Sequence, residues 1–230
     1  MDFNMAIGLL DGLLRVSPVA YAIVLLALTT SMNIAELLGL RRKRVNLSNA
    51  AIMLGDRSLS GESIAVRENF YRGVFGTVKQ KSRNRDLPIS RGALPVLKEV
   101  MAGSNFKGPD DLVFGTEKGT PLDEKNLMRR VIKPVGAKLE MAWMGWHVFR
   151  HTHSTLAEEL GMALSDRQAQ LGHGDYHMTM HYTHSDLKRR RGTLDRMADR
   201  LTGSTPESVT EAANLTLSDT NRESIIAVNY

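Results

Sequence analysis

The pattern of hydrophobic and polar positions changes twice along this chain, from helical periodicity to short alternating runs and back again. The most apolar stretch, residues 19–32, is too short to cross a membrane and leads into polar positions, so it predicts a buried core helix over about 18–29. Ser17 and Pro18 are the N-cap and first helical residue that such a helix favours. A second helix is predicted over 33–40.

The residue pattern in the middle of the chain is typical of a small sheet. Residues 62–90 are rich in β-branched and aromatic side chains, and Gly73, Gly76 and the polar run QKSRN interrupt them. This predicts an antiparallel sheet of two or three strands. Helical patterns return at 91–102, 122–140, 148–160, 165–172 and 184–200. Ser165 is the expected N-cap of one of these helices and Gly161 the expected stop of another. We therefore expect an α+β fold, mainly helical with a small antiparallel β-sheet.

The two ends of the chain differ from the middle. The opening MDFNMAIGLLDGLLRVS has no basic segment before a cleavable apolar run, so it does not resemble a secretion signal. After Leu201 the sequence is polar and turn-rich until the apolar run IIAVNY, which predicts a flexible tail over 202–230. We expect one domain over 1–201 followed by this tail.

Composition narrows the class of partner. The 230 residues include 30 Lys and Arg against 25 Asp and Glu, which gives a formal charge of +5. Such a balance suits a polyanionic partner, although an ordinary basic protein has it too. The chain has no cysteine, so a disulfide framework and a thiolate metal site are both excluded. This composition fits a cytoplasmic protein.

Residues suited to phosphate chemistry gather in the C-terminal half. His147 and Arg150 occur in HVFRHTHSTLAEELG, His173 occurs in LGHGDYHMTMHYTH, and Tyr182 follows His173 by nine residues. An arginine can hold two phosphate oxygens at once, a histidine can donate to another, and a tyrosine oxygen can form a covalent bond to phosphorus. The set is typical of a metal-free enzyme that cleaves a phosphodiester.

A metal site is the alternative interpretation of the same histidine-rich region. His147 and His151 have the spacing of neighbours on one helix face, and the chain contains seven histidines. However, no glutamate lies between these two in the manner of H-E-x-x-H, and no cysteine or carboxylate completes a ligand set at fixed spacing. We therefore expect neither a metal nor a small-molecule cofactor.

The two C-terminal runs, together with VKQKSRNRDLPIS, resemble the catalytic domain of the tyrosine recombinases, the phage-type integrases. The resemblance covers roughly residues 17–201 and implies a DNA breaking and rejoining fold. It implies that Tyr182 attacks a DNA phosphodiester and forms a 3′-phosphotyrosine. Arg150 and His173 would contact the phosphate, and His147 would contact it or transfer a proton.

The resemblance also implies a catalytic lysine on a hairpin. Counting nine residues back from Pro88 gives Lys79 as the group that protonates the departing 5′ oxygen, with Lys81 as a nearby alternative. A general acid must come within hydrogen-bond reach, which we expect of this hairpin only when DNA is bound. A charged hairpin that contacts solvent or phosphates non-specifically is the other interpretation.

One position departs from the resembled family. The segment TTSMNIAELLGL is similar to a family segment in which an arginine stands three residues before the glutamate, and here that residue is Asn33. Loss of one transition-state donor typically costs about 10²–10³ in rate. Either the activity is impaired, or another cation such as Arg41, Arg42 or Arg44 substitutes, which requires the chain to fold back.

The resemblance implies DNA integration or recombination by an enzyme of a phage or mobile element. Double-stranded DNA is the expected partner, with self-association on DNA and no membrane. Integration, excision and dimer resolution share this chemistry. The alternative is an impaired DNA-binding remnant or regulator, which Asn33 and the expected absence of the family's N-terminal core-binding domain favour; a type IB topoisomerase is a third reading. The IIAVNY run either packs on a neighbouring protomer or is an unstructured end.

Overall fold

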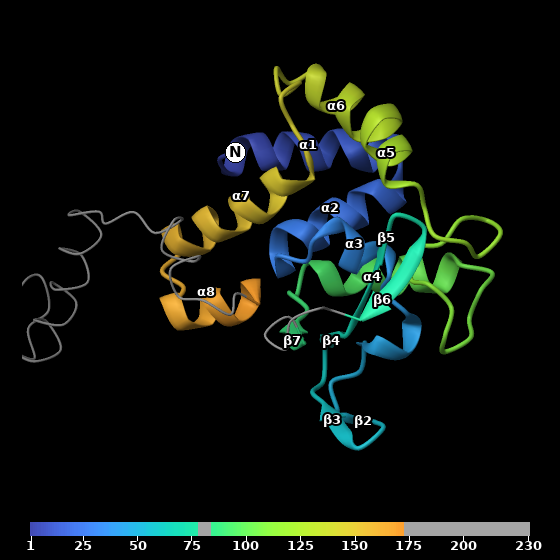
Figure 1. Cartoon of the computed structure of the whole chain (residues 1–230). Helices are drawn as coiled ribbons and strands as arrows, with labels where there is room; N and C mark the ends of the chain where they lie inside the picture. Colours follow the sequence, from blue (N-terminus) through green and yellow to red (C-terminus); the bar gives the residue numbers. More distant parts are fainter. Residues whose placement is uncertain (78–83, 173–230) are drawn as a thin grey trace, which may run out of the picture. The chain divides into compact units, whose positions relative to one another are not determined.

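The computed structural model describes residues 1–77 and 84–172, and the architecture below is that of these residues (Figure 1). The helices are α1 (Phe3–Val16), α2 (Pro18–Thr30), α3 (Ile34–Leu38), α4 (Ala93–Gly103), α5 (Glu124–Leu127), α6 (Lys133–Ala137), α7 (Trp146–Glu159) and α8 (Leu164–Leu171). A 3₁₀ turn, η1 (Arg42–Arg44), follows α3, and a π-helical turn, η3 (Met128–Ile132), joins α5 to α6. No helix in this part of the chain is long and apolar enough to cross a membrane.

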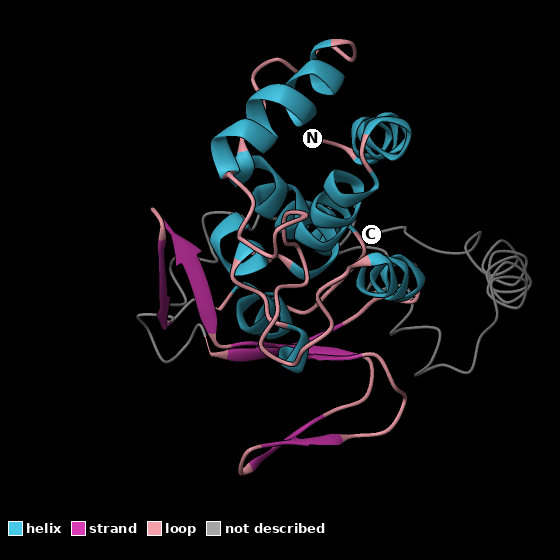
Figure 2. Cartoon of the chain, turned by 90° about the vertical axis from the view of Figure 1, so that its right-hand side faces the viewer, coloured by secondary structure: helices cyan, strands magenta, loops and turns pink. Residues whose placement is uncertain are grey.

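The strands form a small sheet and two hairpins, all antiparallel. They are β1 (Val45–Asn46), β2 (Ile52–Leu54), β3 (Arg57–Leu59), β4 (Ser63–Val66), β5 (Glu68–Tyr71), β6 (Val74–Thr77) and β7 (Arg85–Pro88). The sheet has the order β1-β4-β7, with Ile64 of β4 opposite both Val45 and Leu87. The β2–β3 hairpin projects away from the helices, whereas the β5–β6 hairpin lies beside them (Figures 1 and 2).

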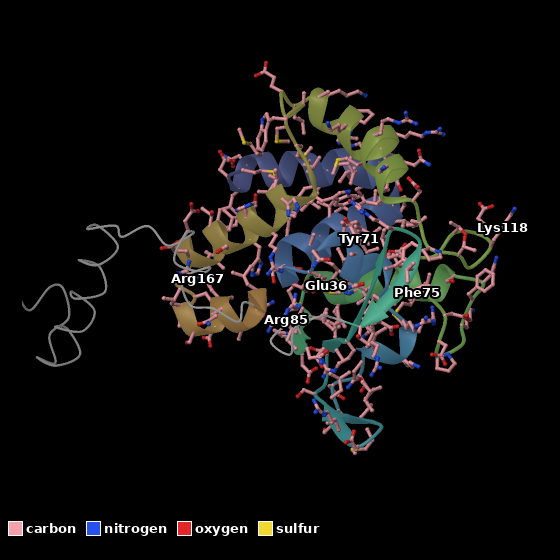
Figure 3. All side chains as sticks on the ribbon, viewed as in Figure 1. Glu36, Tyr71, Phe75, Arg85, Lys118 and Arg167 are labelled. Carbon is pink, nitrogen blue, oxygen red and sulfur yellow. The ribbon has the colours of Figure 1, made fainter. Side chains whose placement is uncertain are left out.

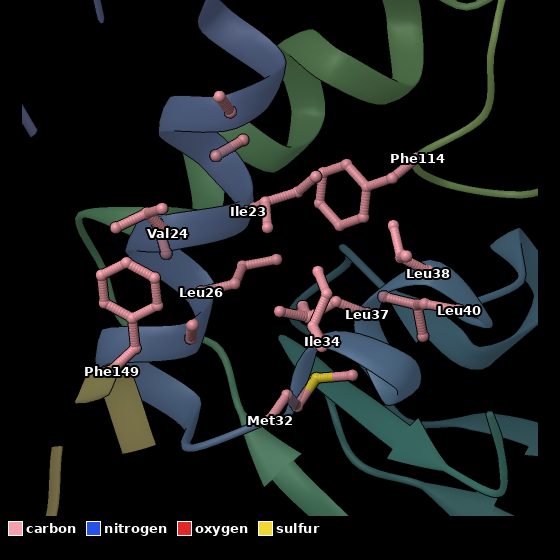
Figure 4. Close-up of a cluster of buried hydrophobic side chains, with 14 of the residues drawn as sticks. Ile23, Val24, Leu26, Met32, Ile34, Leu37, Leu38, Leu40, Phe114 and Phe149 are labelled. Atoms are coloured by element: carbon pink, nitrogen blue, oxygen red, sulfur yellow. The ribbon is translucent and has the colours of Figure 1, made fainter. Parts of the chain in front are cut away.

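The core is built around α2, as the apolar run predicts. Ile23, Val24 and Leu26 are almost fully buried, because α1, α3, α4 and α7 all contact this helix (Figure 4). Phe149 of α7 and Phe114 complete the cluster from opposite sides. Burying a side chain of this size contributes roughly 1.5–3 kcal/mol. The predicted α+β class, mainly helical with a small antiparallel sheet, is confirmed.

Helix ends follow the sequence signals with one exception. The Ser17 side chain accepts a hydrogen bond from the backbone N–H of Ala20, and Pro18 is the first residue of α2, as predicted. Gly161 has a φ of +83° and directly follows Leu160, the C-cap of α7, which confirms it as the stop of that helix. Ser165 as an N-cap is wrong. Helix α8 begins at Leu164, because Ala163 is the extended residue before it, so Ser165 already lies inside the first turn.

Local pattern did not predict every element. Helix α1 was not predicted, although its buried positions Ala6, Leu9 and Leu13 recur at helical spacing. Strands β1, β2 and β3 lie before the predicted sheet region and are two or three residues long. Strands this short depend on their partners more than on their own sequence. The predicted helix 184–200, the boundary after Leu201 and the tail lie outside the described residues.

Candidate active site

A pocket of about 510 Å³ opens where α3, β5, α5 and α7 meet. Its lining comprises Asn33, Ile34 and Ala35 at the start of α3, Asn69 and Tyr71 of β5, Glu124 of α5, and Trp146, His147 and Arg150 of α7. The fold therefore brings together three of the residues that the sequence singled out: Asn33, His147 and Arg150.

Helix α7 presents His147 and Arg150 on one side. The helix begins at Trp146, so the two residues stand one turn apart and both line the pocket. Trp146 packs edge-on against Phe149, with 5.8 Å between the ring centroids, and this contact fixes the start of α7 against the core. The imidazole of His147 is exposed at the mouth, and the guanidinium of Arg150 is half-buried.

Arg150 is held by the C-terminal ends of two other helices. One of its terminal nitrogens donates to the carbonyl oxygen of Ser31, 2.9 Å away, and the other donates to the carbonyl oxygen of Leu171. Ser31 ends α2 in a left-handed conformation with a φ of +62°. The carbonyl ends of helices carry partial negative charge, which favours a cation at this place.

A buried network ties the end of α8 to the same region. The backbone oxygen of Gln170 accepts from the Ser31 hydroxyl at 2.6 Å and from Nε of Arg85 at 2.9 Å. The terminal nitrogens of Arg85 pair with both carboxylate oxygens of Glu36 at 3.0 Å, and both side chains are almost fully buried (Figure 3). The backbone three residues before His173 is thus anchored by Ser31 and Arg85.

Four of the predicted site residues lie outside the described residues: Tyr182, His173, Lys79 and the alternative Lys81. Their assignments stay predictions. The structure does describe the elements that precede Lys79 and His173 in the chain. Strand β6 ends two residues before Lys79, and α8 ends two residues before His173.

Asn33 has a defined local role. It is the N-cap of α3: its Oδ1 accepts from the backbone N–H of Glu36 at 2.9 Å, and Glu36 Oε2 accepts from the backbone N–H of Asn33 at 3.0 Å. This reciprocal capping box satisfies two N–H groups at the helix start. Asparagine is among the best N-cap residues. At this position the chain has a neutral helix cap, and its correspondence to the family's arginine stays a prediction.

The hypothesis that Arg41, Arg42 or Arg44 folds back to replace that guanidinium is wrong. Arg41 pairs with Glu68 at 3.0 Å, and Arg42 donates to the backbone oxygen of Met101 at 2.9 Å. Neither these two nor Arg44 lines the pocket. All three lie in or next to η1, which continues from α3 toward β1, away from Asn33 at the other end of that helix.

The other histidines of α7 are not part of the pocket. His153 is buried with Nδ1 2.8 Å from the carbonyl oxygen of Leu28, and burial lowers its pKa. The pKa of His151 is lowered too, by burial first and then by the nearby His147 and Arg150. Within residues 1–77 and 84–172, no group of three His, Asp or Glu side chains could hold a metal ion.

Three pocket residues were not anticipated: Asn69, Tyr71 and Glu124. Nothing in their local sequence marks them. Asn69 and Tyr71 reach the pocket because β5 passes close to α3, and the contact requires Gly39, where a Cβ would lie 2.7 Å from backbone atoms of Asn69 and Phe70. Glu124 comes from α5. A glycine after the LL pair that ends a helix is the sole sequence signal of this close approach.

Comparison with known proteins gives a consistent result. The model of the phage integrase family matches residues 15–189. The integrase of Staphylococcus phage L54a is 28% identical over 181 residues, which are 75% of this chain and 49% of that protein. Tyrosine recombinase XerC of Pseudomonas entomophila (strain L48) is 25% identical over 199 residues, covering 85% of this chain and 58% of that protein. The chain thus spans about half the length of these curated relatives.

Solved structures show the same fold. The Tn1549 transposon integrase in complex with circular intermediate DNA superposes with a TM-score of 0.68 at 21% identity, covering 86% of this chain and 66% of that one. The XerA recombinase superposes with a TM-score of 0.62 at 19% identity, covering 86% and 64% respectively. At these identities the likeness establishes the architecture, and it agrees with the predicted DNA breaking and rejoining fold.

Proposed function

The chain belongs to the phage integrase family, and from that premise we propose that it cleaves and rejoins DNA at specific sites through a covalent 3′-phosphotyrosine. The observation that carries the proposal is the pocket in which His147 and Arg150 of α7 face the N-terminus of α3. A fixed guanidinium beside an exposed imidazole is suited to a phosphate whose oxygens gain negative charge during attack.

In the proposed reaction Tyr182 is the nucleophile. Its oxygen attacks phosphorus, a new P–O bond forms, and the bond to the 5′ oxygen breaks, with Lys79 donating the proton that this oxygen needs. A free tyrosine has a pKa near 10, so its proton must be removed during attack, a step we assign to His147. Arg150 and His173 hold the non-bridging oxygens. The 5′ hydroxyl of a second strand then reverses the step.

The proposal requires no metal or cofactor, because the phosphotyrosine retains the energy of the phosphodiester. Double-stranded DNA is the proposed substrate. In the solved relatives, the Tn1549 integrase is bound to transposon and circular intermediate DNA, and lambda integrase is a tetramer on a Holliday junction. By analogy we propose that this chain self-associates on DNA and acts in the cytoplasm, where such DNA lies.

A DNA-binding remnant that no longer cleaves is the second candidate. Asn33 favoured it in the sequence. The comparisons do not favour it, since the matching relatives are named as integrases and tyrosine recombinases.

Covalent capture tests the proposed function. A library of nicked duplexes with randomised sequence is incubated with the full chain and a chelator, and protein-linked DNA is recovered under denaturing conditions and sequenced. We expect a linked product with a defined sequence, formed by the wild type and by Tyr21→Phe but not by Tyr182→Phe. The proposal fails if no linked DNA is recovered, or if Tyr182→Phe forms as much as the wild type.

A further inference from the structure

The described lining of the pocket carries little positive charge. Among the residues that line it, all in the described part of the chain, Arg150 is the only lysine or arginine, and Glu124 brings a carboxylate to the opposite wall. Asn33 is neutral, and its Oδ1 is engaged by the backbone N–H of Glu36. A phosphodiester under attack spreads negative charge over two non-bridging oxygens, and of the residues proposed to hold them, Arg150 is the one guanidinium.

The β5–β6 hairpin is firmly seated next to this pocket. Gly39 lets the backbone of β5 lie directly against the end of α3. Arg41 pairs with Glu68 at the base of the hairpin and places its guanidinium 4.7 Å from the centroid of the Phe75 ring. Phe75 in turn packs against Phe70 across the two strands, with 4.9 Å between centroids. These contacts fix where the tip of the hairpin points.

The tip carries a cation in an unusual backbone conformation. Tyr71 pairs with Val74, which leaves Arg72 and Gly73 as a two-residue turn with φ values of +51° and +81°. Positive φ at both positions defines a type I′ turn, which strongly prefers Asn-Gly. An arginine pays a conformational cost in the first position, and such strain is a reason to look for a function.

Tyr71 connects that cation to the pocket. The guanidinium of Arg72 lies 5.1 Å from the centroid of the Tyr71 ring, and Tyr71 itself lines the pocket together with His147 and Arg150. Arg72 lines an adjoining pocket with Asp123 and Lys125, and the two pockets share Tyr71 and Glu124. Arg72 is exposed, and no described carboxylate forms an ion pair with it. Its long side chain can therefore turn to an anion that enters the pocket without breaking a salt bridge.

We propose that Arg72, presented on the Tyr71 ring at the hairpin tip, supplies to the scissile phosphate the second guanidinium that Asn33 does not provide. This inference rests on the proposed function and adds a residue to its site. The guanidinium donates to a non-bridging oxygen as charge develops on it, so its contribution falls mainly on the rate of cleavage and little on DNA affinity.

The test is a set of single-turnover rates of adduct formation by full-length variants on the captured DNA sequence. Arg72→Asn creates the Asn-Gly pair that the turn prefers, so it removes the guanidinium while favouring the hairpin. We expect the rate to fall by about 10²-fold or more, with DNA affinity within a few-fold of wild type. Arg72→Lys keeps a charge without a fork and should give an intermediate rate.

Rescue distinguishes a direct role from an indirect one. Adding Asn33→Arg to Arg72→Asn should restore most of the lost rate, because a guanidinium then enters the pocket from α3. Arg57→Asn, which removes an exposed arginine from the separate β2–β3 hairpin, is the matched control and should leave the rate unchanged.

The outcomes separate the two proposals. If the wild type forms no adduct, the proposed function itself is wrong. If the wild type cleaves and Arg72→Asn is as fast as Arg57→Asn, Arg72 has no role in the site. A slow Arg72→Asn variant that Asn33→Arg fails to restore overturns the idea of substitution. The proposal for Arg72 is also overturned if Lys81→Gln is slow and Asn33→Arg restores its rate of adduct formation, because Lys81 would then be the substituting cation.

Discussion

Asn33 shows how one side chain serves local structure at the expense of charge. Its amide oxygen caps α3, and the same short helix carries Glu36, whose carboxylate both completes the capping box and holds Arg85. An arginine at this position would bring a guanidinium to the pocket but has no oxygen with which to accept from the helix N–H groups. The residue at position 33 can therefore either cap α3 or bring a cation to the pocket, but not both.

Substitutions of Asn33 separate its role as the cap of α3 from the effect of charge at this position. Asn33→Ala removes the cap and should lower the free energy of unfolding by about 1 kcal/mol. Asn33→Asp keeps an oxygen in the same place and should leave stability close to wild type, yet its charge repels the phosphate, so adduct formation should slow. Urea unfolding and single-turnover rates give the two readouts. Equal stability of the Ala and wild-type proteins would contradict the role as cap.

At the scale of elements, the ends of three helices support the pocket from behind Arg150. The end of α2, the end of α8 and the start of α3 converge, and two arginines, Arg150 and Arg85, join them through backbone oxygens and the buried Glu36. Because each contact is between groups withdrawn from water, loss of one partner leaves another uncompensated.

Arg85 is expected to position the segment that leads to His173. Arg85→Met leaves the Glu36 carboxylate buried without its partner and should cost about 3–5 kcal/mol of unfolding free energy. Combining it with Glu36→Gln should recover part of that stability, because the buried charge is then gone. Adduct formation should stay slow in the double variant, since Gln170 has lost its Arg85 donor.

Arg167→Met is the matched control for this prediction. It breaks the other described buried pair, Arg167 of α8 with Glu158 of α7 at 2.9 Å. A double Arg85→Met and Glu36→Gln variant that reacts at the wild-type rate would show that Arg85 serves stability alone.

Sequence periodicity predicted the elements that are amphipathic or wholly apolar over several turns, as in α2, α4 and α7. It did not predict β1–β3, since strands of two or three residues acquire their identity from the strand beside them. In the site, the spacing of His147 and Arg150 on one turn could be read directly. Tyr71 and Glu124 could not, because they join the pocket through tertiary approach alone.

At the scale of the whole molecule, a buried titratable side chain joins α7 to α2 through a hydrogen bond. His153 is buried between them, with Nδ1 against the carbonyl oxygen of Leu28, and burial holds its pKa below the usual value near 6.5. As the pH falls through this usual value, the unfolded chain takes up the proton before the folded protein does. The stability from a neutral His153 is therefore complete above about pH 6.5 and declines below it.

The free energy of unfolding should consequently fall between pH 7.5 and pH 5.5. The contribution of one such group has a slope of at most about 1.4 kcal/mol per pH unit. His153→Gln, which keeps a donor for Leu28 and removes the titration, should flatten the curve. Urea unfolding across this range measures it, and parallel curves for His153→Gln and wild type would contradict the assignment.

The seating of the β5–β6 hairpin has a consequence for protein engineering. Its base is immobilised by Gly39 and Arg41, while its two turn residues are exposed, with the Arg72 guanidinium against the Tyr71 ring. The strands of the hairpin are thus held in place, whereas its two turn residues can be replaced. Any dipeptide that accepts positive φ can be installed there without repacking the interior, so chemically different tips can be screened on one unchanged scaffold.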